Sequence, residues 1–95
     1  MIFNTSYNPL KEQQEEILTQ EKENNHLVLF NDDFNTFDFV IDTLVKVCKH
    51  DAIQAEQCAY LVHFSGKCSV KTGSLQKLEP MCTALLDRGL TAEIQ

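Results

Sequence analysis

The chain lacks any apolar run close to the roughly 20 residues that a helix needs to cross a bilayer. Its first residues, MIFNTSYNPL, also lack the basic start and apolar core of a signal peptide. We therefore expect a soluble, cytoplasmic protein with no membrane contact. Basic residues are few too, since eight Lys and Arg stand against 14 Asp and Glu and give a formal charge of −6. Because such a chain repels phosphates, nucleic acid is not an expected partner.

Paired cysteines and nucleophile motifs are missing as well. The four cysteines are spread singly through apolar sequence, without the C-x-x-C spacing of structural zinc sites. No serine lies in a G-x-S-x-G pattern, and nothing pairs a nucleophile with a base. We therefore predict a protein that is not an enzyme and that holds no metal or cofactor. Free cysteine usually packs as a small hydrophobe, which predicts buried reduced thiols at Cys48, Cys58, Cys68 and Cys82.

The most distinctive segment is HLVLFNDDFNTFDFV, in which an apolar run stops on Asn31, Asp32 and Asp33. An amide and two carboxylates at a strand end offer many acceptors to a cation, whether an α-ammonium group, Lys, Arg or a metal ion. The alternative is a turn in which the aspartates accept from backbone amides. His63 also has two interpretations. It is either a functional residue or a structural one, because a histidine near a helix C-terminus often packs through its stem, and the helix dipole favours its charged form there.

Length and composition predict one compact domain with an extension. A chain of 95 residues suffices for a single modest core. Residues 1–25 are polar and rich in Glu and Gln, which predicts a flexible N-terminal extension. Residues 26–95 carry the periodic apolar pattern of a folded domain.

Periodicity and turn residues predict three strands and three helices in that domain. The expected strands are residues 27–30, 68–71 and 90–95, and the expected helices are residues 36–49, 52–64 and 75–86. The expected N-caps are Asn35 or Thr36, Asp51 and Ser74. Pro80 indicates that the third helix either starts near Glu79 or is kinked. The order β-α-α-β-α-β predicts an α+β fold, with the helices on one face of a small three-stranded antiparallel sheet.

Two separated segments resemble one known family. The arrangement LVLFNDDFNTFDFVIDTL, followed about twenty residues later by AEQCAYLVHFSGKC, resembles the ClpS family over roughly residues 27–95. Members of that family are adaptors that recognise N-degrons, typically an N-terminal Leu, Phe, Tyr or Trp, and deliver the substrate to a Clp-type AAA+ unfoldase. We expect a monomer, which is the economical state for a small adaptor that must be shared and released. The resemblance implies an adaptor that binds the first residue of its substrate.

The resemblance also implies site residues. The substrate α-amino group would be held by Asn31, Asp33 and His63, with Asp32 beside them. The side chain of the first residue would enter a pocket lined by Leu29, Phe30, Asn35, Phe37, Val40, Ala59, Val62 and Leu90. Lys77 is the best match to a lysine that docks on the unfoldase.

Three departures from the common family pattern affect the pocket. Phe37 and Ala59 stand where methionines are common, and Asn35 stands where threonine is common. These changes leave open how the N-terminal residues rank and whether N-terminal Ile and Val are rejected. The alternative function is a protein-interaction domain with this fold that does not select for a free N-terminal amine.

Overall fold

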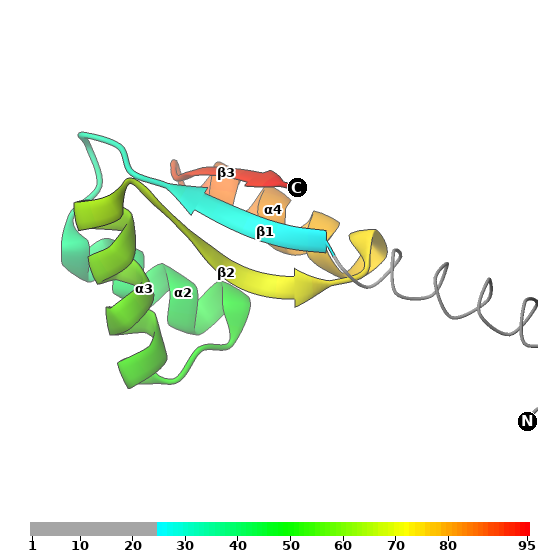
Figure 1. Ribbon diagram of the computed structural model, residues 1–95, viewed down its shortest axis with the longest axis horizontal. Helices are drawn as coiled ribbons and strands as arrows, with labels where there is room; N and C mark the ends of the chain where they lie inside the picture. The colour runs from blue at the N-terminus through cyan, green and yellow to red at the C-terminus, as the bar shows by residue number, and fades with distance from the viewer. Residues whose placement is uncertain (1–24) are drawn as a thin grey trace, which may run out of the picture.

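The computed structural model describes residues 25–95, which form three strands and three helices in the predicted order (Figure 1). The elements are β1 (Asn25–Phe30), α2 (Phe37–Cys48), α3 (Ala52–Ser65), β2 (Lys67–Gly73), α4 (Leu75–Asp87) and β3 (Thr91–Ile94). The predicted extension lies outside the described residues, except for Asn25, which opens β1. None of the helices within residues 25–95 has the length and hydropathy of a membrane span.

The sheet has the strand order β2-β1-β3, and both pairs are antiparallel, as predicted. The central strand β1 carries the apolar run, and Leu29 lies between Cys68 of β2 and Ala92 of β3. Leu27 and Leu29 join residues of all three helices in one core cluster. The helices therefore cover the sheet face that carries these two leucines, since alternate side chains of a strand point to the same face.

Side-chain caps fix where the helices begin. Of the two caps expected for α2, Thr36 is the one used, and its hydroxyl accepts from the amide of Phe39 at 3.1 Å. Asp51 caps α3 and Ser74 caps α4 in the same way. Gly66 ends α3 with a φ of 93°, a left-handed conformation that glycine adopts without a Cβ clash.

Every element differs from its predicted range by one or two residues at an end, and two of the differences have a clear physical reason. Strand β2 is longer than residues 68–71 because it pairs with the whole of β1, from Asn25 opposite Gly73 to Phe30 opposite Lys67. Helix α4 begins at Leu75, so the predicted start near Glu79 is wrong. The Ser74 cap satisfies its first turn, and Pro80 costs only one intrahelical hydrogen bond.

The cysteines follow the prediction of buried thiols in part. Cys48 and Cys58 are buried, whereas Cys68 and Cys82 are only partly covered. Burial raises the pKa of Cys48 to about 11, although Lys71 lowers it somewhat. Burial, followed by the neighbouring Cys68, raises the pKa of Cys58 to about 12. Both buried thiols are therefore protonated at neutral pH and are poor nucleophiles.

Candidate functional site

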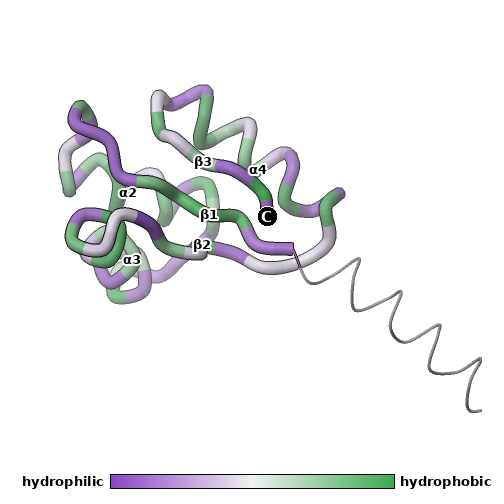
Figure 2. The backbone as a smooth tube through the Cα atoms, turned by 45° about the horizontal axis from the view of Figure 1, so that its top comes forward, coloured by the Kyte–Doolittle hydropathy of each residue, from purple (hydrophilic) through white to green (hydrophobic). Residues whose placement is uncertain are grey.

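The loop that follows β1 is organised by Asp32. Figure 2 shows the hydrophobic centre of β1 giving way to this hydrophilic loop. One carboxylate oxygen of Asp32 accepts from the backbone amides of Phe34 and Asn35, each at 2.8 Å. The other accepts from the side-chain amide of Asn35, also at 2.8 Å. Asp32 thus forms the turn that was the alternative interpretation of the acidic pair.

Asn35 connects this loop to the start of β3. Its side-chain Nδ2 donates to Asp32 and also to the backbone carbonyl of Gly89, at 2.9 Å. Gly89 lies directly before Leu90, which is buried and lines the cavity described below. We call the contacts among Asp32, Asn35 and Gly89 the polar clasp. The clasp joins two segments that are 54 residues apart in the sequence.

The polar clasp gives the stability of the domain a pH dependence. Burial raises the pKa of Asp32, but the hydrogen bonds from Asn35 and Phe34 outweigh it, and the net effect lowers the pKa below its usual 3.8. A lowered pKa in the folded state means that the stabilising contribution is present above pH 3.8 and is lost as the pH falls through the folded value.

We therefore expect Asp32→Asn to be less stable than the wild type at pH 5 to 7, and the difference to shrink as the pH is lowered below about 3.8. Urea unfolding across that pH range measures the difference. Asp33→Asn is the matched control, because Asp33 is exposed and makes no hydrogen bond within residues 25–95, and it should keep wild-type stability at neutral pH. A stability difference between Asp32→Asn and wild type that is the same at every pH would contradict this role of Asp32.

His63 lies beside the acidic loop. The backbone amide of Asn31 donates to the carbonyl of Gly66 at 2.9 Å, which ties the end of β1 to the end of α3 (Figure 1). His63 is in the last turn of α3, exposed, and its ring meets the ring of Phe37 edge-on at a centroid distance of 6.4 Å. The fold therefore brings Asn31, Asp33 and His63 to the same end of the domain.

A small cavity lies beneath this loop. Six of the eight predicted pocket residues line it, together with Asn31 and Asp32, namely Leu29, Phe30, Asn35, Val40, Val62 and Leu90. Its volume is about 10 Å³, which is no more than one water molecule needs. The cavity must therefore widen before it can admit a Leu or Phe side chain.

The other two predicted pocket residues lie apart from the cavity. Phe37 is 37% exposed and packs beside His63 at the surface. Ala59 is buried in the core, with 2% of its surface exposed. Each nevertheless lies one helical turn from a residue that lines the cavity. Phe37 precedes Val40 on α2, and Ala59 precedes Val62 on α3.

Lys77, the predicted docking residue, lies far from this site. It is in the first turn of α4, which follows β2 at Gly73, and Gly73 pairs with Asn25 at the end of the sheet opposite the acidic loop (Figure 1). The aliphatic stem of Lys77 passes close to Gly73, since a Cβ there would lie 3.1 Å from its Cδ.

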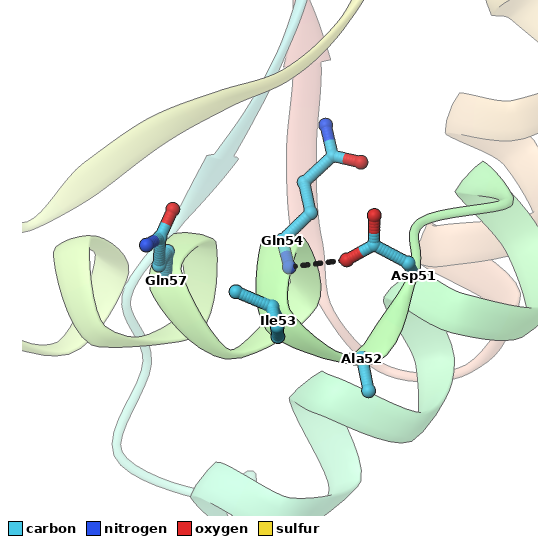
Figure 3. A pocket seen from close by; sticks show the side chains of 5 residues that line it. All are labelled: Asp51, Ala52, Ile53, Gln54 and Gln57. Atoms are coloured by element: carbon cyan, nitrogen blue, oxygen red, sulfur yellow. Dashed lines mark hydrogen bonds between the residues drawn. The ribbon is translucent and has the colours of Figure 1, made fainter.

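A larger hollow of about 480 Å³ lies at the start of α3, but its lining has few side chains that could bind or activate a ligand. Figure 3 shows its five lining side chains and the hydrogen bond that the backbone amide of Gln54 donates to the Asp51 carboxylate, 2.8 Å long. That cap uses the one charged side chain of the lining, and the remainder are Ala52, Ile53 and two glutamines. Within residues 25–95, no three His, Cys, Asp or Glu side chains group as metal ligands.

Comparison with known proteins gives one consistent result. The family model for the ATP-dependent Clp protease adaptor protein ClpS matches residues 20–93. The ClpS adapter protein of Salmonella gallinarum is 39% identical over 51 residues, which are 52% of this chain and 48% of that protein. The ClpS adapter protein of Treponema denticola is 38% identical over 50 residues, which are 53% of this chain and 50% of that protein. The chain thus spans about half the length of the curated relatives that it matches.

A solved structure shares the fold. The structure of Agrobacterium tumefaciens ClpS2 bound to L-phenylalaninamide superimposes with a TM-score of 0.74, at 19% sequence identity, and the match covers 78% of this chain and 96% of that one. Fold and site define a small α+β domain with an acidic loop over a small cavity and a histidine at the same end of the domain. The chain belongs to the ClpS family, the ATP-dependent Clp protease adaptor proteins.

Proposed function

We propose that this protein is a cytoplasmic adaptor that binds the first residue of N-degron substrates and delivers them to a Clp-type AAA+ unfoldase. One observation supports the proposal above all others: the Asn31–Gly66 hydrogen bond joins the acidic loop to the end of α3 that carries His63, and a small cavity with an apolar wall lies beneath that loop. Recognition of an apolar first residue requires acceptors for its α-ammonium group and an apolar cavity for its side chain. The adaptor acts by binding and has no catalytic step of its own.

The acceptor set matches an α-ammonium group. An ammonium has three N–H donors, and the Asn31 carbonyl, the Asp33 carboxylate and a neutral His63 ring nitrogen each accept one hydrogen bond. Asp33 and His63 are exposed and have no hydrogen-bond partner within residues 25–95, so they are available to a ligand. Asp32 uses its carboxylate in the polar clasp, but it adds negative charge beside the ammonium.

The cavity supplies selectivity for an apolar side chain. Burying a Leu or Phe side chain contributes about 1.5–3 kcal/mol, and each charge-assisted hydrogen bond to the amine adds about 1.5–3 kcal/mol. Because the cavity holds only about 10 Å³, it has to widen on binding, and two of the segments that border it are the loop and the segment before β3. The polar clasp spans those two segments, and we expect it to resist this opening.

The closed cavity also favours a second candidate function. A domain whose cavity stays closed would bind other proteins through its surface and would not distinguish a free amine. This second candidate is a protein-interaction domain with the same fold and no amine selectivity.

Peptide titration separates the two functions. We expect a fluorescent peptide that begins with Phe or Leu to bind at least tenfold more tightly than its N-acetylated twin, because acetylation removes the charge and two of the three donors. Fluorescence anisotropy measures both affinities. A matching peptide that begins with Ser controls for the cavity and should bind weakly. Equal affinity of the free and acetylated peptides would favour the interaction domain.

A further inference from the structure

Four aromatic rings form a continuous row on the outer surface of α2 and α3. The rings of Phe37 and His63 meet edge-on at 6.4 Å, those of His63 and Phe64 at 4.7 Å, and those of Phe64 and Tyr60 lie tilted at 4.4 Å. We call these four residues the aromatic row. Phe64 and Tyr60 are 66% and 55% exposed, although large apolar rings are normally covered. Contiguous exposed apolar surfaces are common at binding sites.

The aromatic row includes one of the proposed amine-binding residues. His63 belongs both to the row and to the proposed acceptor set, and the Asn31–Gly66 hydrogen bond keeps the acidic loop beside it. Phe64 is the next residue along α3, and Tyr60 lies one turn before Phe64 on the same stripe of the helix. The row therefore leads away from the proposed amine site along the exposed side of α3.

The spacing of the row suits a peptide chain. An extended chain advances about 3.3–3.6 Å per residue. A peptide whose ammonium is held at His63 therefore passes the ring of Phe64 and then that of Tyr60 within two or three residues, given the ring separations of 4.7 and 4.4 Å.

We propose that Phe64 and Tyr60 form a second subsite, which binds an aromatic or large apolar side chain at the second or third position of the substrate. This inference rests on the proposed function, because the amine site sets where the peptide begins. Stacking on exposed rings predicts a preference of about threefold to tenfold for such a residue over serine. The substrate class would then be defined by two neighbouring residues.

The test uses the full chain and a pair of labelled peptides that differ only at positions two and three, Phe-Phe-Phe and Phe-Ser-Ser, each followed by the same polar tail. In anisotropy titrations the wild type should bind the first peptide about threefold to tenfold more tightly. The double variant Tyr60→Ser, Phe64→Ser should lose that preference, which is measured as the ratio of the two affinities because Phe64 also contacts His63. Ile53→Ser is the matched control, since Ile53 is 70% exposed on the same helix outside the row, and it should keep the preference.

The outcomes distinguish the two proposals. Equal binding of both peptides by the wild type, or an unchanged preference in the double variant, would overturn the second subsite while leaving the amine site in place. Failure of both peptides to bind more tightly than their N-acetylated twins would overturn the proposed function itself. A change of oligomeric state in the double variant with no change in peptide preference would make the row a contact between copies, which also overturns the subsite.

Discussion

Replacing Asp33 by alanine should weaken the binding of a Phe-initiated peptide by about tenfold to a hundredfold, because a charge-assisted hydrogen bond contributes about 1.5–3 kcal/mol. Asp33 is the acidic residue whose carboxylate is not used inside the loop, so it can meet the substrate ammonium. Anisotropy titration with the labelled peptide measures the loss. The free energy of unfolding should stay unchanged, since the exposed side chain has no hydrogen-bond partner within residues 25–95.

The neighbouring Asp32 provides the contrast. Asp32→Ala removes three acceptor contacts of the loop and should lower the stability of the domain together with its peptide affinity. Unaltered binding by Asp33→Ala would remove this residue from the amine site. A loss of stability in Asp33→Ala as large as that in Asp32→Ala would assign Asp33 a structural role.

Replacing Leu44 by alanine should destabilise the domain by about 2–5 kcal/mol, the usual cost of a leucine deletion in a tightly packed core. Leu44 is fully buried on α2 and belongs to the core cluster that joins the helices to the sheet. The same helix carries Val40 on the cavity wall, so loosening its packing should weaken peptide binding as well. Urea unfolding followed by circular dichroism measures the stability.

Val45 is the matched control for Leu44, because it is the next residue of α2 and is 37% exposed. Val45→Ala should cost clearly less than Leu44→Ala, since fewer contacts are lost and solvent fills the space. Equal costs for the two variants would mean that the core does not depend on Leu44.

The fold followed from local signals in the sequence. The apolar run before Asn31, the caps Asp51 and Ser74 and the terminating Gly66 each carry their effect within a few residues. The length of β2 was underestimated because pairing with β1 adds Lys67, Thr72 and Gly73 to the strand, and these residues have no strand pattern of their own. Tertiary pairing can thus override weak local propensity.

The candidate site was predictable only in part. The acidic loop and His63 have recognisable sequence signals, and the family resemblance placed them together. The contact between Asn35 and Gly89 has no such signal, because it joins two loops through one side-chain amide. The volume of the cavity could not be predicted from the sequence either, since it depends on how Leu29, Val40 and Val62 pack against one another.

The most direct measurement is a crystal structure of the protein with a peptide that begins with Phe. The proposed function predicts the ammonium nitrogen within hydrogen-bonding distance of Asn31, Asp33 and His63, and the Phe ring in the widened cavity beside Val40 and Val62. It also predicts that the hydrogen bond between Asn35 and Gly89 lengthens as the cavity opens. A bound peptide whose amino group points to solvent, with the cavity still closed, would contradict recognition of the first residue.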